Sequence, residues 1–318
     1  MSSLSMTGEN FANLDPEQLF YAAFTAAHFG QFDALKAALE KGADTHAVNS
    51  GGQTLLLIAA SRGRADCVQI LAPISDAKMA NKDGKTALMC AAAAGDPQSV
   101  ETLLPLSDPE AKDRAGRTAL AQAIQAGSVE CVRRLAPKSA HATQRSGGVN
   151  YLALAALKAQ AGYSANSKPS AEECAEMILL IGAFSDPGLR DDNGRTALMR
   201  IMEHDKPHVK AVAALASISK IDQRSWGGET AASIGLMNAP SPEKWAAIDL
   251  LSALSENGDR ERALAILGRE KLPKSAAREE AKAISLEIQR VDDLVAGTNN
   301  KGEKPGLEAR TGPGSRRI

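Results

Sequence analysis

A motif of glycine, one variable residue and threonine recurs along the chain at a nearly fixed interval. Its copies, one of which has asparagine in place of threonine, start at Gly52, Gly84, Gly116, Gly148, Gly194 and Gly228. The steps between copies are 32, 32, 32, 46 and 34 residues. A period in this range is typical of a solenoid, in which each unit buries its apolar face against its neighbours. Such an array offers an extended surface and usually no catalytic pocket.

Composition narrows the classes of partner. The chain has 37 basic and 38 acidic residues, so its overall charge favours neither nucleic acid nor an anionic membrane. No apolar run approaches the ~20 residues of a membrane helix. Residues 1–10 hold neither a basic stretch nor an apolar run, so no secretory signal is visible. The expected compartment is the cytoplasm, and the alternative of a secreted effector without a cleaved signal stays open.

The four cysteines predict free thiols. They are Cys67, Cys90, Cys131 and Cys174, and none forms a Cys-x-x-Cys pair. Cys67 and Cys131 occupy the same position two units apart. Packed helices lie roughly 8–10 Å apart, so these two residues are beyond the ~7 Å between Cα atoms that a disulfide allows. Buried thiols in a reducing compartment are the interpretation that follows.

One unit, residues 81–113, shows the expected local structure most clearly. Asn81-Lys82-Asp83-Gly84 predicts a turn, because Gly84 adopts positive φ without steric cost. Thr86 is placed to cap a following helix, which Gly95 then ends. Apolar residues at helical spacing predict a second helix from about Gln98 to Leu104. Each unit is therefore expected to be a turn followed by two short helices.

This turn–helix–helix unit resembles the ankyrin repeat. The Thr-Ala-Leu part of the family signature is present at Thr86, Thr118 and Thr196. Alanine replaces the family's proline, and its histidine is missing from every unit. The phrase Asn-Lys-Asp-Gly-Lys-Thr-Ala-Leu-Met looks like ankyrin arrays of bacteria and protists. The resemblance implies an all-α ankyrin-repeat solenoid whose function is to bind proteins.

The repeat register also predicts the domain organisation. About seven units form an ankyrin-repeat domain over residues 15–256, after a flexible N-terminus at residues 1–14. Residues 257–296 are expected to form a C-terminal helical cap, and the glycine-rich residues 297–318 a disordered tail. The fifth unit has 14 extra residues (46 minus 32), at about residues 159–172 between its two helices. This insertion is either a functional excursion or a tolerated surface loop.

Within the expected cap, one segment has an apolar heptad stripe. The stripe consists of Ala277, Ala281, Ile284, Ile288, Val291 and Val295. Its first interpretation is a helix that packs on the seventh unit and leaves the protein a monomer. The alternative is a helix pair that joins two copies of the chain.

Phenylalanines gather at the other end of the chain. Five of the six lie in the first 32 residues, at Phe11, Phe20, Phe24, Phe29 and Phe32. The first interpretation is an N-terminal cap built of larger side chains. The alternative is an aromatic anchor for a partner.

Catalytic and metal-binding patterns are almost absent. His204 and His208 lie four residues apart beside Glu203, but Pro207 interrupts the helix and the His-Glu-x-x-His order is missing. No phosphate-binding loop is present. We expect no metal, no cofactor and no enzymatic activity. An enzyme built on the insertion and the C-terminal helices is the weaker alternative, because about 40 residues are too few for an ordinary domain.

The resemblance implies a binding face made of the turn tips and the first helices on a concave side. Candidate partner-binding residues on that face are Lys82, Lys85, Arg114, Arg117, Arg62, Gln125, Arg195 and Trp226. The basic turns favour an acidic segment of a protein partner, and a turn-tip tryptophan suits a binding hot spot. Three alternatives remain open: a solvated face, Trp226 packed beneath Trp245, and nucleic acid bound along the basic turns. Scarce stacking aromatics and the balanced charge argue against nucleic acid. The predicted function is a non-enzymatic protein-binding scaffold or adaptor.

Overall fold

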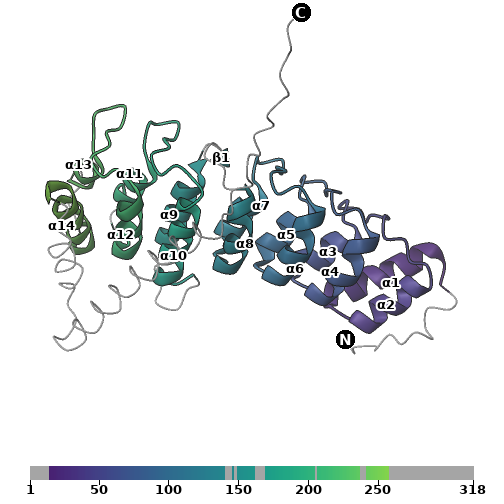
Figure 1. Cartoon of the computed structure of the whole chain (residues 1–318). Coiled ribbons are helices and arrows are strands. Elements are labelled where there is room, and N and C mark those ends of the chain that lie inside the picture. Colours follow the sequence, from purple (N-terminus) through teal and green to yellow (C-terminus); the bar gives the residue numbers. More distant parts are fainter. Residues whose placement is uncertain are drawn as a thin grey trace, which may run out of the picture. The chain divides into compact units, whose positions relative to one another are not determined.

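The computed structural model describes residues 14–139, 145–146, 149–161, 169–204, 206–236 and 241–257. These residues all belong to one compact unit, which covers residues 1–270. Their helices follow one another in antiparallel pairs (Figure 1). The first helices of the pairs are α1 (Pro16–Phe29), α3 (Leu55–Ser61), α5 (Ala87–Ala94), α7 (Ala119–Ala126), α9 (Tyr151–Ala161), α11 (Ala197–Met202) and α13 (Ala231–Leu236). The second helices are α2 (Phe32–Glu40), α4 (Ala65–Leu71), α6 (Pro97–Leu103), α8 (Val129–Ser139), α10 (Ala171–Gly182), α12 (Val209–Ile218) and α14 (Pro242–Asn257).

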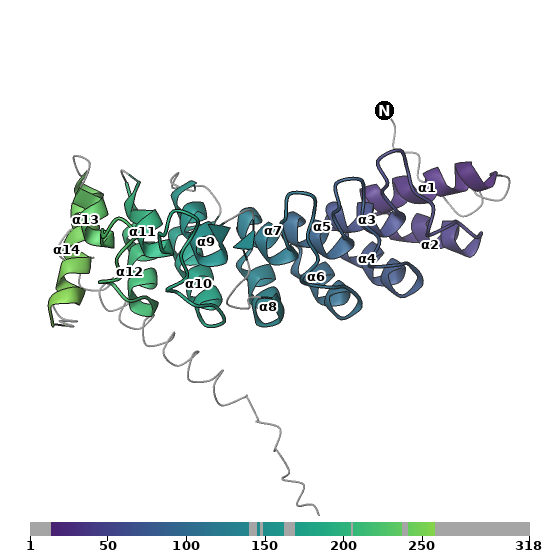
Figure 2. The same cartoon turned by 90° about the horizontal axis from the view of Figure 1, so that it is seen from above.

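Each helix packs on the corresponding helix of the next pair. First helices contact first helices from α1 to α13, and second helices contact second helices from α2 to α14. The two rows are visible from above in Figure 2. The result is the mostly helical solenoid expected from the repeat period.

Threonines start the first helices as predicted. The hydroxyl oxygens of Thr54, Thr86, Thr118 and Thr196 each accept a hydrogen bond from the backbone N–H three residues later, at 3.3–3.4 Å. In the fifth unit, where asparagine replaces the threonine, Asn150 has the same role, since its Oδ1 accepts a hydrogen bond from the N–H of Ala153 at 2.6 Å. A side-chain oxygen here satisfies a helix N–H that would otherwise lack a partner.

Two local features differ from a purely helical expectation. Residues Arg145–Ser146 and Val149–Asn150 form a minimal antiparallel pair, β1 and β2, at the turn of the fifth unit. Short 3₁₀ turns, η2 (Ala72–Ile74) and η3 (Leu104–Leu106), continue α4 and α6. Each has its proline at the second position, where a missing N–H costs little.

The insertion of the fifth unit is partly helical. Residues 159–161 belong to α9 and residues 171–172 to α10, which have 11 and 12 residues where α5 and α6 have 8 and 7. Pro169 lies against the end of α7, because a Cβ on Gly127 would be 2.5 Å from its Cδ. Residues 162–168 lie outside the described part of the chain.

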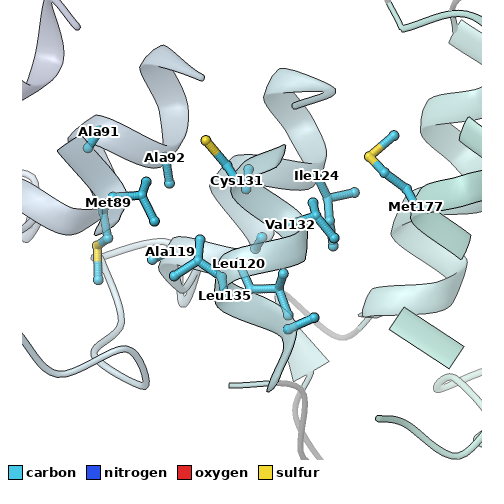
Figure 3. Packing of buried hydrophobic residues seen from close by; sticks show 14 of the residues in the cluster. Met89, Ala91, Ala92, Ala119, Leu120, Ile124, Cys131, Val132, Leu135 and Met177 are labelled. Carbon is cyan, nitrogen blue, oxygen red and sulfur yellow. The ribbon is translucent and has the colours of Figure 1, made fainter. Parts of the chain in front are cut away.

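Small side chains allow the helices of neighbouring units to approach closely. In α5 and α7, Ala91, Ala92 and Ala123 are fully buried. Larger side chains fill the space between the rows, where Figure 3 shows Leu120, Val132 and Leu135 together. Burial of this apolar surface against the next unit is the main source of stability in such an array.

The N-terminal phenylalanines separate into two groups. Phe20 is buried and Phe24 packs partly on the core, while Phe29 is 60% exposed and Phe32 is 37% exposed at the α1–α2 junction. The described residues do not include Phe11. They also do not include the predicted tail at residues 297–318 or, apart from Asn257, the predicted C-terminal cap at residues 257–296. The predicted domain boundaries therefore stay predictions.

Successive turns are joined by backbone hydrogen bonds. The N–H of Lys82 donates to the carbonyl of Gly51 at 3.3 Å, and the N–H of Arg114 donates to the carbonyl of Asp83 at 3.0 Å. Gly84, with φ of 77°, packs directly beneath the second bond, because a Cβ there would be 3.0 Å from the Arg114 nitrogen. The turns of units two, three and four are thus held to one another.

We expect Gly84→Ala to destabilise the protein more than Gly228→Ala. Both glycines have positive φ, which costs a non-glycine residue about 1–2 kcal/mol, but nothing lies within 4 Å of a Cβ at Gly228. Urea denaturation followed by circular dichroism measures both variants. Equal losses would show that contact between turns adds nothing to stability.

Candidate interaction face

The predicted binding residues lie at two ends of the first helices. Lys82 and Lys85 are in the turn before α5, and Arg114 is in the turn before α7. The backbone hydrogen bond from Arg114 to Asp83 joins these two turns. Arg62 is the C-cap of α3 and Gln125 is in the last turn of α7. A helix of seven or eight residues is about 11 Å long, so Arg62 and Gln125 are separated from the turn tips by that length.

Three cations at the turn tips have uncompensated charges. Lys82 and Arg114 are exposed and Lys85 is half-buried. Among the described residues, none of the three forms an ion pair. We call Lys82, Lys85 and Arg114 the basic turn cluster. Asp83 is the acidic side chain exposed between them.

Arg117, by contrast, is occupied within its own turn. Its Nε donates to Oδ2 of the buried Asp113 at 2.9 Å. The other carboxylate oxygen of Asp113 accepts the backbone N–H groups of Ala115 and Arg117 at 2.9 and 2.8 Å. Gln122, which lies on α7, donates its Nε2 to Oδ2 at 3.0 Å. The guanidinium of Arg117 therefore stabilises the turn, and its charge is largely cancelled.

Arg195 is also compensated. Its guanidinium forms ion pairs with Glu203 and, at 3.6 Å, with Glu229 of the next turn. Arg200 pairs with Asp191 and Glu203, so acidic and basic groups alternate across two units. This network was not predicted from the sequence, because Glu203 and Glu229 are far from Arg195 along the chain. One sequence feature could have indicated part of this network. Arg200 and Gln122 lie at the same position of the repeat, nine residues after Asp191 and Asp113.

Trp226 is the most exposed large apolar side chain among the described residues, at 70%. Its ring rests on the preceding turn, since a Cβ on Gly194 would lie 2.4 Å from ring atoms of the indole. One ring face is thus supported by backbone while the remainder is open to solvent. Trp245 is separately exposed at 48%.

The described residues offer no arrangement typical of metal binding. They contain no group of three or more histidine, cysteine or acidic residues that could hold a metal ion. All four cysteines are buried and free. Burial raises the pKa of the Cys90 and Cys174 thiols to about 11, so both are neutral near pH 7 and poor nucleophiles. None of the described helices is long and apolar enough to cross a bilayer.

Comparisons with known proteins agree with this architecture. A sequence model for ankyrin repeats (3 copies) matches residues 19–113 and 91–166. The human ASB11 ankyrin repeat domain has a similar structure, with a TM-score of 0.55 and 17% identity over 79% of this chain and 98% of that one. The ankyrin repeat domain of Bcl-3, a member of the IkappaB protein family, gives a TM-score of 0.55 and 18% identity over 73% of this chain and 97% of that one. A search of curated proteins finds no match.

These findings place the function in a general class. Ankyrin repeats are generally protein–protein interaction modules, and the family is typically non-enzymatic. Three observations agree with the ankyrin-repeat family: the helix pairs, the capped turns and the sequence match in residues 19–166. Residues 19–166 therefore consist of ankyrin repeats, and the described helix pairs of the chain share the ankyrin-repeat fold.

Proposed function

We propose that this protein is a non-enzymatic scaffold or adaptor that binds a protein partner across its turn tips and first helices. The observation that supports the proposal most is the basic turn cluster, whose charges are uncompensated on a face of hydrogen-bonded turns. Charges that a protein does not pair internally are available to a partner. An acidic segment is the complementary chemistry.

The internal ion pairs favour a smaller set of contact residues within this proposal. Arg117 and Arg195 already form internal ion pairs, so a partner would have to break these pairs to use them. Lys82, Lys85 and Arg114 need no such exchange. We therefore assign the electrostatic part of binding to the basic turn cluster and an apolar contact to Trp226.

The rigidity of the turns supports binding without rearrangement. The side chain that begins a turn accepts backbone N–H groups two and four residues later at Asn49, Asn81, Asp113, Asp191 and Ser225, as Asn81 does for Asp83 and Lys85 at 2.9 and 3.0 Å. A preorganised surface loses less conformational entropy when it binds. Cations on such turns hold their spacing before the partner arrives.

Charge reversal of the basic turn cluster tests this function. We expect the K82E/K85E/R114E variant to lose acidic proteins captured from lysate of the source cell by the wild type. Quantitative mass spectrometry measures the captured set. Charge reversal at an interface typically slows association by about tenfold or more at low salt, so the loss should be large.

The control variant is K36E/K41E/K138E, which makes the same change in charge at exposed lysines on or beside second helices. It should retain the wild-type set. If the K82E/K85E/R114E variant captured the same proteins as the wild type, the basic turn cluster would not be the binding site.

A further inference from the structure

The junction between α1 and α2 exposes two phenylalanines to solvent. Phe29 is the last residue of α1 and is 60% exposed, and Phe32 is the first residue of α2 and is 37% exposed. The junction of α5 and α6 also contains a left-handed glycine, yet it has Ala94 and Pro97 at the same two positions. Large aromatic side chains are therefore not required to form such a junction.

Arginine side chains of the second unit lie against this junction. Arg64 packs on Gly30, because a Cβ on that glycine would be 2.8 Å from the arginine Cδ. The Nε of Arg64 donates a hydrogen bond to the backbone carbonyl of His28 at 3.3 Å. Arg62 holds the position at the end of α3 that Phe29 holds at the end of α1, and these two helices pack side by side (Figures 1 and 2). We call this surface the junction patch, and it consists of Phe29, Phe32, Arg62 and Arg64.

The positive charge of the junction patch is available to a ligand. Both arginine side chains are exposed, and within the described part of the chain neither forms an ion pair with a carboxylate. The His28 ring, which contacts the Phe29 ring edge-on at 4.6 Å, responds to this charge. Burial lowers the pKa of His28, and the positive charges of Arg62 and Arg64 lower it further. The charges that act on this ring are therefore positive.

We propose that the junction patch is a second binding surface, and that it takes a short peptide of a protein partner with a carboxylate beside a large apolar side chain. A guanidinium group binds a carboxylate through two parallel hydrogen bonds. Exposed phenylalanine rings cover an apolar side chain, and arginine and aromatic residues are typical of the contacts that dominate protein interfaces.

This surface is separate from the basic turn cluster. The junction patch lies at the C-terminal ends of the first helices, whereas the basic turn cluster precedes their N-terminal ends. A first helix of seven residues, such as α3, places about 11 Å between these two ends. The two surfaces can therefore be tested independently.

The charges around the patch favour a peptide over an anionic membrane. Segments that bind anionic lipids typically have clusters of about four to eight basic residues. Here two arginines are accompanied by exposed carboxylates at Asp33 and Asp66, in the first turns of α2 and α4. A broad anionic surface would be repelled by these carboxylates, whereas a short peptide can bind without contacting them.

Selection from a library of random short peptides displayed on phage tests the proposal with the full chain. The selection uses the K82E/K85E/R114E variant, because acidic peptides are not retained by the reversed basic turn cluster. We expect the enriched peptides to share an acidic residue beside phenylalanine, tryptophan or leucine. In fluorescence anisotropy, a fluorescein-labelled enriched peptide should bind the wild type, and both R62E/R64E and F29S/F32S should raise its Kd by about tenfold or more.

Two control variants make this measurement specific. Tyr21→Ser removes an aromatic side chain that is 50% exposed on α1, about 12 Å before the junction. K41E/K138E makes the same change in charge as R62E/R64E at exposed lysines away from the patch. Both should bind the peptide as the wild type does. A selection without an acidic and apolar consensus would overturn the proposal, as would an unchanged Kd in R62E/R64E with circular dichroism that shows an intact helical fold.

Cosedimentation with vesicles of phosphatidylcholine and phosphatidylserine separates a peptide from a membrane surface. We expect the wild type and R62E/R64E to remain in the supernatant to the same extent. If the wild type bound these vesicles and R62E/R64E did not, the patch would be a membrane contact and the proposal would be wrong. The capture experiment on the basic turn cluster does not depend on this result, so either proposal can fail alone.

Discussion

Replacing Leu120 with alanine should lower the free energy of unfolding by about 3–5 kcal/mol. Leu120 is fully buried between the two helix rows, in the cluster with Val132 and Leu135 shown in Figure 3. The substitution removes apolar contacts and leaves a cavity that the surrounding helices fill only in part. Urea denaturation monitored by circular dichroism at 222 nm gives the change.

The matched control for this prediction is Leu106→Ala. Leu106 is 43% exposed in the turn η3, so its loss should cost less than about 1 kcal/mol. A similar cost for the two substitutions would mean that the space around Leu120 is not a close-packed core. A broad or two-step transition in the Leu120 variant would show that the array unfolds in parts.

The second large effect is expected at Asp191, where Asp191→Asn should cost about 2–3 kcal/mol at pH 7. Asp191 is buried, and its Oδ1 accepts the N–H groups of Asn193 and Arg195 at 2.9 and 3.0 Å. Its Oδ2 accepts the Nε of Arg200 at 2.5 Å. Asparagine keeps the first oxygen but can place an amide donor against Arg200, and hydrogen bonds to charged groups are worth about 1.5–3 kcal/mol.

The contribution of Asp191 to the free energy of unfolding should decrease as the pH falls. Burial raises the pKa of Asp191, but hydrogen bonds from the backbone of Arg195, the side chain of Arg200 and the backbone of Asn193 outweigh it, so the pKa is lowered. The resulting stabilisation is complete above the unfolded pKa of about 3.9 and is lost as pH falls through the folded pKa. Wild-type stability should therefore fall more between about pH 5 and pH 2 than that of Asp191→Asn. Chemical denaturation at a series of pH values measures this difference.

Two further variants make the Asp191 prediction specific. Asp83→Asn makes the same chemical change at an exposed turn residue and should have little effect. The double variant D191N/R200C reproduces the Asn81 and Cys90 pairing of the third unit and should recover part of the loss. Additive losses at the two positions would contradict a direct coupling between them.

The first residue of a turn correlates with the residue nine positions later, on the following helix. Turns that begin with Asn49, Asn81 or Ser225 have apolar Ile58, Cys90 and Ile234 nine residues later. Turns that begin with Asp113 or Asp191 have the donors Gln122 and Arg200 at that position, and both bond to the carboxylate. The second oxygen of a buried carboxylate needs a donor, whereas the second polar group of asparagine is itself a donor and takes an acceptor, as Asn49 does with Gln53.

The repeat period and the motifs within each repeat determined the fold class. Glycines at fixed steps need positive φ, and threonines two residues later can cap a helix, so turn, cap and helix follow from local chemistry. The same local rules placed Gly95 as a left-handed helix end. Such features depend on neighbours within a few residues, which the sequence contains directly.

The tertiary structure decided which surface charges remain available. Lys85, Arg117 and Arg195 hold the same place in their turns, yet only the last two form ion pairs. Their partners are Asp113 at the start of the same turn, Glu203 at the end of the following helix and Glu229 of the next unit, so the repeat motif itself does not specify them. The exposure of Leu236 and Trp245 is likewise not specified by the repeat motif, because it depends on packing. Electrostatic pairing and burial depend on what packs against a residue in space, and that is the information the local pattern lacks.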